Sequence, residues 1–207
     1  MTYLKQFLVF ALFVFYTVGV VDASQIGPNE VKPGSVLTGE FSQERYLNGF
    51  EAPLVSSGDF FLFPSKGLAW RVFEPFESRL IMTSEGITQI THGSIMKVVG
   101  TTGLAKLIGG LMYPALSGDW QKLKNNFEVN VEQSAATDTE WTASLRPVNE
   151  TIGKIIESIE LTGGTTTRSL IIFKTNGDRD EIQFKSQEIL SVPSKEAINA
   201  FSIDGNN

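Results

Sequence analysis

The chain of 207 residues has no cysteine and only one histidine, His92. Without cysteine it can form neither a disulfide framework nor a Cys-His nucleophile. A classical zinc site needs several His or Cys ligands, and a Ser-His-Asp triad would have to use His92 without any Gly-x-Ser-x-Gly elbow. We therefore expect no catalytic residue, no metal and no cofactor.

Basic residues are outnumbered by acidic ones. Seventeen Lys and Arg stand against 23 Asp and Glu, which gives a net charge of −6. An acidic chain is poorly suited to nucleic acid or to an anionic lipid surface. We expect no nucleic-acid partner and only transient contact with membranes. The pair Glu74 and Glu77 could be imagined as a glycosidase dyad, but sequence spacing does not set their separation, and a solvated face is the simpler interpretation.

The N-terminus is typical of an export signal. Lys5 precedes an apolar or small-residue stretch over 7–21, and small residues flank a cleavage site near Ala23. The apolar run is short for a membrane span. We expect residues 1–23 to be a cleaved signal peptide and residues 24–207 to form one exported domain, although an uncleaved anchor is the alternative.

Alternating hydrophobicity predicts a sheet of about ten short strands. Period-two patterns separated by turn residues cover 35–44, 57–63, 68–72, 79–83, 87–91, 127–131, 141–145, 155–161, 168–174 and 180–185. Asn149 is a candidate cap for a short helical turn through Gly153. Phe61 and Phe63 lie opposite Phe60 and Leu62 in their strand, which indicates that both faces of this strand are covered. The fold class expected is α+β, with a curved antiparallel sheet.

Helical spacing replaces this alternation between Ser94 and Leu116. Apolar residues there recur at helical intervals and four glycines interrupt them, so we expect one or two loosely packed helices. If such a segment covers the concave face of a curved sheet, the space between them could hold an acyl chain. A fully packed core without a cavity remains the alternative at this point.

The order of these segments resembles the LolA-type outer-membrane lipoprotein carrier family. The resemblance rests on an ordered set of short segments spread over about 35–201, none of them specific alone. They are 39–43 (GEFSQ), 57–62 (SGDFFL), 68–71 (LAWR), 74–75 (EP), 81–86, 116–120 (LSGDW), 145–147 (LRP), 176–178 (NGD) and 182–184 (IQF).

This resemblance implies an incomplete β-barrel with a helical lid. It implies a periplasmic carrier that takes acylated cargo from an inner-membrane exporter and passes it to an outer-membrane acceptor. The cargo would be an acylated lipoprotein, or a glycolipid or polyene-lipid. The sheet pattern, the helical stripe and the resemblance together make the candidate binding residues Phe41, Phe60, Leu62, Leu68, Trp70, Val72, Ile81, Leu104, Leu107, Ile108 and Leu111.

Two features of the family pattern are missing. The family has an Arg-Pro pair after its second strand, where the Arg ties down the lid, whereas this chain reads Phe63-Pro64-Ser65 with Lys66 nearby. The family also begins with an amphipathic helix, which 25–35 cannot readily form because it contains two prolines. We expect a divergent, non-enzymatic carrier. The alternatives are an acyl or glycosyl hydrolase of the envelope, and a scaffold that would expose Phe61, Phe63, Phe73 and Phe76.

Overall fold

The structure is a computed structural model that describes residues 26–99, 104–134, 137 and 139–203. For residues 98, 99 and 104–109 it describes the backbone alone. The expected signal peptide, 1–23, lies outside the described residues.

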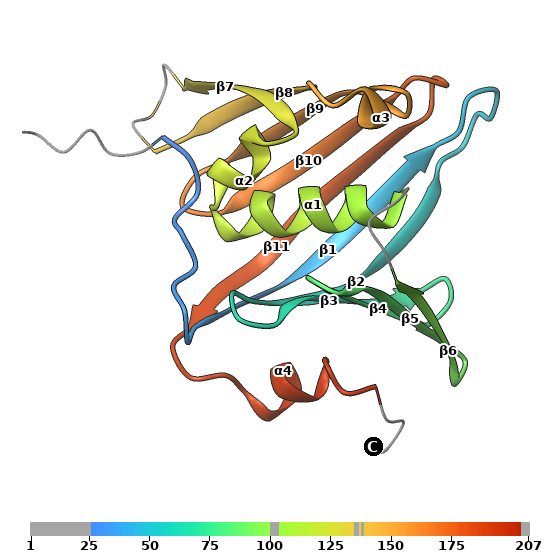
Figure 1. The fold of residues 1–207 in the computed structure, drawn as a ribbon, viewed down its shortest axis with the longest axis vertical. Helices are drawn as coiled ribbons and strands as arrows, with labels where there is room; N and C mark the ends of the chain where they lie inside the picture. The colour runs from blue at the N-terminus through green and yellow to red at the C-terminus, as the bar shows by residue number, and fades with distance from the viewer. Residues whose placement is uncertain (1–25, 100–103, 135–136, 138, 204–207) are drawn as a thin grey trace, which may run out of the picture.

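The described chain forms one curved antiparallel sheet of eleven strands (Figure 1). Its spatial order is β6-β5-β4-β3-β2-β1-β11-β10-β9-β8-β7. β1 and β11, the first and last strands along the chain, are therefore neighbours in the middle, whereas β6 and β7 are the two edges and the sheet does not close. The strands are β1 (Val36–Tyr46), β2 (Leu54–Phe63), β3 (Gly67–Glu74), β4 (Ser78–Thr83), β5 (Gly86–Thr91), β6 (Ser94–Val99), β7 (Phe127–Gln133), β8 (Trp141–Pro147), β9 (Ile156–Gly163), β10 (Thr167–Lys174) and β11 (Arg179–Leu190).

Four helices complete the described fold. They are α1 (Leu104–Ser117), α2 (Trp120–Lys124), α3 (Glu150–Gly153) and α4 (Lys195–Asn199). α1 crosses the concave face of the sheet, and α4 lies on the opposite side of β2 and β3 (Figure 1). Within the described residues, no helix is both long enough and apolar enough to cross a bilayer. The expected fold class, a curved open sheet with a helical cover, is confirmed.

The strand and cap predictions outside 94–99 are largely confirmed. Each expected strand is present with slightly different ends, and Asn149 caps α3 by accepting hydrogen bonds from the backbone N–H groups of Thr151 and Ile152. As the two prolines imply, the described part of 25–35 forms no helix. Sequence periodicity therefore captured most of the elements that form the sheet.

The prediction that a helix begins at Ser94 is wrong, because residues 94–99 form strand β6. The turn before it was missed. His92 and Gly93 have φ angles of 49° and 76°, and Thr91 pairs directly with Ser94. Two successive positive φ angles in a two-residue loop are what a hairpin turn requires. The turn sends the chain back along β5, and the helix begins only at Leu104.

Gly58 marks the place where the sheet bends between β2 and β3. The register shifts between Ser57 and Gly58, and a Cβ atom on Gly58 would come within 1.8 Å of the Arg71 backbone oxygen. A side chain could not occupy that position, so only glycine permits this bulge. The bend gives β2 and β3 their share of the sheet's curvature.

The core consists of two clusters on opposite faces of the sheet. The larger lies between the concave face and α1 and α2, and it includes Phe60, Leu111 and Trp120. The smaller lies on the convex face of β1, β2 and β3 beneath α4, where Phe61 and Phe63 are buried. Both faces of β2 are therefore covered, as the sequence pattern predicted.

Candidate ligand-binding site

Four aromatic rings form the floor of the concave face. The rings of Phe41 and Trp70 stack with centroids 3.8 Å apart, and Phe60 lies 6.1 Å from Trp70. Phe184 contacts Phe60 and Trp70 edge to face at 5.6 and 6.2 Å. Phe41 pairs across the strands with Gly58, and the missing side chain there lets its ring reach Trp70. We refer to these four rings as the aromatic floor.

A row of aliphatic side chains continues the floor toward one end of the sheet. Leu37 pairs with Leu62, Leu62 with Leu68, Leu68 with Met82, and Met82 with Ile87, across five neighbouring strands. All five side chains belong to the larger core cluster. Because directly paired residues share a face, these strands present one continuous apolar row to α1.

Six of the predicted binding residues lie together on this face. Phe41, Phe60, Leu62, Leu68 and Trp70 are buried in the larger cluster, and Val72 is partly buried against it. From the lid side, Leu111 of α1 belongs to the same cluster. Leu104, Leu107 and Ile108 lie in the first part of α1, whose side chains are outside the described set.

Ile81 is the exception, and its assignment to the concave face is corrected. It pairs with Ala69, which belongs to the cluster on the convex face. Its neighbours Leu80 and Met82 contact the concave core instead. Side chains alternate along a strand, so placing the pattern one residue out of step moved Ile81 to the wrong side.

A cavity of about 580 Å³ opens at the end of the aliphatic row. It lies between the β2–β3 turn, the β4–β5 turn and the second half of α1. Met82 and Ile87 line the cavity and belong to the core cluster as well, so the cavity adjoins the apolar face directly. The lining, as far as the described residues go, includes none of the eleven predicted binding residues. Phe41, Phe60, Leu62, Leu68 and Trp70 are packed in the core under α1 instead.

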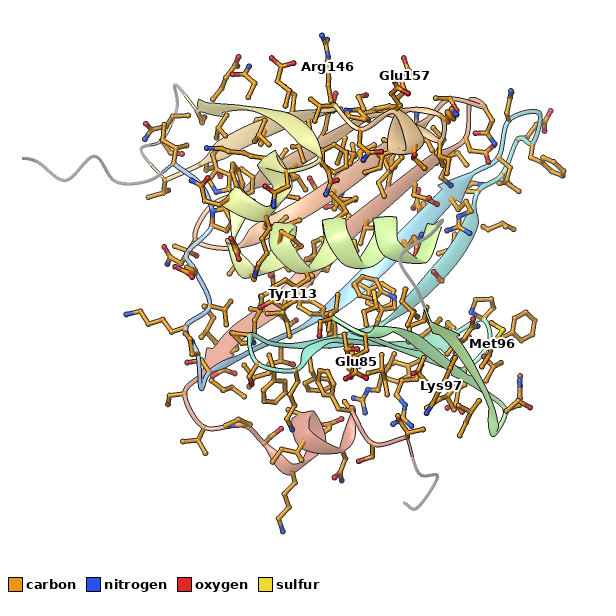
Figure 2. All side chains as sticks on the ribbon, viewed as in Figure 1. Glu85, Met96, Lys97, Tyr113, Arg146 and Glu157 are labelled. Carbon is orange, nitrogen blue, oxygen red and sulfur yellow. The ribbon has the colours of Figure 1, made fainter. Side chains whose placement is uncertain are left out.

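Tyr113 joins α1 to the turn that borders this cavity. Its hydroxyl donates a hydrogen bond to the backbone oxygen of Pro64 at 3.3 Å, and Tyr113 extends from α1 toward the β2–β6 half of the sheet (Figure 2). Burial raises the pKa of the Tyr113 phenol above its ordinary value. This contact fastens the lid to the residue next to the position where the family resemblance implies an arginine.

The mouth of the cavity is polar and carries charges of both signs. Lys66, Glu85 and Lys122 are exposed there, and with Asp119 beside Lys122 the positive and negative charges balance. Lys122 pairs with Asp119 at 2.6 Å, and this bond raises the pKa of the Lys122 ammonium. An apolar interior with a few charged groups at its rim is the arrangement expected of a site for an amphiphile.

Several residues of this site were missed by the sequence reasoning. Phe184 shares the alternation of Ile182 in β11, and its aromatic side chain was an available signal. Met82 could have been found by shifting the β4 pattern by one residue, and Ile87 is its direct partner across the β4–β5 hairpin. Gly110, Tyr113 and Pro114 line the cavity from α1, and no periodic signal distinguishes them from ordinary helix residues.

The described residues show no site that favours the enzymatic alternative. His92 is exposed in the β5–β6 turn rather than buried beside a serine and a carboxylate. Among the described residues, no three His, Cys, Asp or Glu side chains gather to hold a metal ion. For the scaffold alternative, Phe61 and Phe63 are buried beneath α4, whereas Phe73 and Phe76 are 46% and 72% exposed.

Comparisons with known proteins concern the fold. No protein-family model and no curated protein matches the chain. Among solved structures, a LolA superfamily protein from Nitrosomonas europaea is similar with a TM-score of 0.44 and 7% identity, over 83% of this chain and 92% of that one. A domain from Vibrio parahaemolyticus assigned to outer membrane lipoprotein sorting has a TM-score of 0.46 and 4% identity, over 81% and 91%.

A third similar structure is the MucA/MucB complex of Pseudomonas aeruginosa, with a TM-score of 0.42 and 12% identity. The similarity covers 78% of this chain and 54% of that one. These are similarities of fold, and the site is interpreted from this chain's own geometry.

Proposed function

We propose that this chain is a non-enzymatic carrier that binds acyl chains between α1 and the concave face of the sheet. One observation supports the proposal above all: a cavity of about 580 Å³ opens directly onto a continuous apolar row. Pockets for small ligands typically measure about 300–1,000 Å³. An acyl chain gains about 0.8 kcal/mol for each methylene that leaves water, so partial burial suffices for useful binding.

The ligand would enter with its polar end at the mouth. Lys66, Glu85 and the Lys122–Asp119 pair lie at that rim and favour a strongly polar head group. The acyl chain would run past Met82 toward the aromatic floor. Because α1 covers the floor, a long chain requires α1 to move away from Phe60 and Trp70.

The composition of α1 favours such movement. Gly109 and Gly110 lie adjacent within it, and each glycine costs a helix about 1 kcal/mol relative to alanine. Pro114 lies inside the same helix and removes one backbone hydrogen bond. The second half remains fixed, since the Thr167 hydroxyl donates to the Ala115 backbone oxygen at 2.6 Å. We infer that the first half of α1 moves about this anchor.

In the cell, we propose that the carrier works in the periplasm after cleavage near Ala23. It would receive an acylated lipoprotein, a glycolipid or a polyene-lipid from an inner-membrane exporter and deliver it to an outer-membrane acceptor. Transfer would proceed between apolar surfaces without any covalent step. Membrane contact would be transient, in keeping with the net charge of −6.

Gly110→Leu tests the cavity directly. A Cβ atom on Gly110 would meet no atom within 4 Å, and Gly110 lines the cavity, so the position has room for a side chain to begin there. We expect this variant to fold at least as stably as the wild type, because leucine favours a helix more than glycine does. It should bind a fluorescent fatty-acid probe about tenfold or more weakly, since several methylenes lose their place.

Gly153→Ala is the matched control, a glycine replacement at the end of the short helix α3, outside the cavity lining. It should leave binding of the probe unchanged. Mass spectrometry of lipid extracted from the purified wild type should also reveal copurified acyl species. If the delipidated wild type shows no saturable binding of fatty-acyl probes, the carrier proposal fails.

A further inference from the structure

The two edges of the sheet differ in the groups that protect them. β7 carries two exposed carboxylates, Glu128 and Glu132, along its seven residues. β6 carries one charge, Lys97, beside two apolar side chains, Ile95 and Met96, that are 50% and 55% exposed. An edge strand with exposed apolar residues and little charge is open to pairing with another strand.

The hairpin fixes which backbone groups of β6 face outward. Thr91 and Ser94 flank the two-residue turn and form a hydrogen-bonded pair, and bonded and unbonded pairs then alternate along the strands. The unbonded pairs are those of Ile95, Lys97 and Val99. Their N–H and C=O groups therefore point away from β5, toward the free edge on which Met96 and Lys97 lie (Figure 2).

This edge is continuous with the cavity. Val99, at the end of β6, pairs with Gly86, which lines the cavity at the β4–β5 turn. A polypeptide whose acyl chain occupied the cavity would leave the mouth beside the end of β6. β7, the other edge strand, also begins next to a lining residue, Asn126, but its exposed carboxylates Glu128 and Glu132 protect it against pairing with another strand.

A second copy of the chain is a poorer occupant. In an antiparallel pair of two β6 strands, outward-facing residues must lie opposite each other. The register that matches all three of them places Lys97 directly opposite Lys97, and like charges in that position are destabilising. An extended segment of a different polypeptide, above all one with an acidic residue opposite Lys97, meets no such repulsion.

We propose that β6 is the docking strand for an extended polypeptide segment of the cargo, which adds to the sheet next to Ile95, Lys97 and Val99 while its acyl chain lies in the cavity. The inference rests on the proposed carrier function and narrows it, because it favours an acylated polypeptide over a free lipid. Main-chain hydrogen bonds would supply affinity with little demand on sequence, as in other cases of strand addition.

Hydrogen exchange on the full chain tests this. The probes are sodium palmitate and a synthetic N-palmitoylated peptide of alternating valine and serine with one aspartate. We expect the lipopeptide, and not palmitate, to slow exchange at the amides of Ile95, Lys97 and Val99. The same lipopeptide with alternate amides N-methylated should give no protection, since it cannot form the ladder.

Lys97→Pro and Lys97→Gln separate the contribution of the backbone N–H to lipopeptide binding from that of the side-chain charge. Proline removes an outward N–H, which forms no bond to β5, and prolines are tolerated in edge strands. Lys97→Pro should weaken lipopeptide binding about tenfold, comparable to the loss of one strong hydrogen bond, and leave palmitate binding unchanged. Lys97→Gln keeps the N–H and should change lipopeptide binding by less than about threefold.

The outcomes distinguish this inference from the carrier proposal. If palmitate and the lipopeptide both bind but β6 exchanges at the same rate, the docking strand is overturned and the carrier stands. If palmitate does not bind and the lipopeptide still protects β6, the carrier proposal fails, and of the inference only the strand pairing at β6 stands. Protection that rises with protein concentration without any probe would identify a second copy on β6 and overturn the inference.

Discussion

Two helices cover the same strands from opposite sides, and they are held in different ways. α4 lies over the convex face, where Glu196 pairs at 2.6 Å with Arg71, and Arg71 also binds Asp59. Asp59 and Glu196 raise the pKa of the Arg71 guanidinium, with the bond to Asp59 the larger cause. α1, over the concave face, has no acidic residue in its first turn and no basic residue in its last.

The difference fits the roles that we assign to the two faces. Ion pairs and hydrogen bonds hold partners in one geometry, whereas apolar contacts are not directional. A helix segment held mainly by apolar contacts can slide over an apolar surface while most of its area stays buried. We infer that α4 is a fixed cover and that the first half of α1 is the movable part, since the second half is bonded through Tyr113 and Ala115. The predictions below test that contrast.

The largest effect is expected from the floor beneath α1. Phe60 is fully buried and contacts two other aromatic rings, whereas Phe61, its neighbour on the convex face, belongs to the smaller cluster. We expect Phe60→Ala to cost about 4 kcal/mol in the free energy of unfolding and Phe61→Ala about 2 kcal/mol. Urea unfolding with an unchanged m-value measures both. Equal losses in the free energy of unfolding would show that the two clusters stabilise the fold to the same extent. The two faces of the sheet would then not differ in energy.

The second effect separates the two covers. Ala197 of α4 is fully buried against the convex cluster, so Ala197→Asp places an unpaired carboxylate there. We expect a loss of about 2–3 kcal/mol in the free energy of unfolding, with α4 detached. Ile198→Asp, at an exposed position of the same helix, should cost less than about 0.5 kcal/mol.

Fatty-acid binding provides the decisive measurement for that pair. If the convex cover is independent of the cavity, Ala197→Asp should bind the fluorescent probe with unchanged affinity at a temperature where it is still folded. A parallel loss of affinity would show that the faces are coupled through β2 and β3. In that case α4 would be part of the binding site rather than a separate cover.

The sheet was predictable because its strands obey local rules. Polar and apolar residues alternate in β1, β3 and β8, and turn residues separate most neighbouring strands, so each signal lies within a few residues of chain. β6 was not predicted, for a related reason. A short apolar run with residues at 95, 96, 98 and 99 fits a helix as well as a strand, and only the turn at His92 and Gly93 decides between them.

The cover and the cavity depend on contacts that are distant in sequence. α4 has only five residues, too few to be stable without its packing against Phe61 and Phe63. The cavity exists because of where α1 crosses the sheet, which the periodicity of its own residues does not specify. Sequence reasoning therefore found the floor of the site, through residues such as Phe41 and Trp70, but not the open space beside it.

The smallest effect concerns the one hydrogen bond that ties α1 to the rim of the cavity. Tyr113→Phe removes the bond from the Tyr113 hydroxyl to Pro64, which at 3.3 Å and partly buried contributes about 0.5–1 kcal/mol. Ligand binding should become slightly faster without loss of affinity, because the lid is freed and the cavity keeps its shape. Stopped-flow measurement with the fluorescent fatty acid reports both.

The pH dependence of this bond has a definite sign. Burial raises the pKa of Tyr113 in the folded chain, so the neutral phenol is favoured by folding. Its contribution is fully present below the unfolded pKa of about 10 and is lost as the pH rises through the folded pKa. The difference in urea midpoint between wild type and Tyr113→Phe should therefore shrink at alkaline pH, since phenylalanine does not titrate. A difference that stays constant up to about pH 11 would mean that the phenol has the same pKa in the folded and the unfolded chain, so that burial beside the rim does not favour its neutral form.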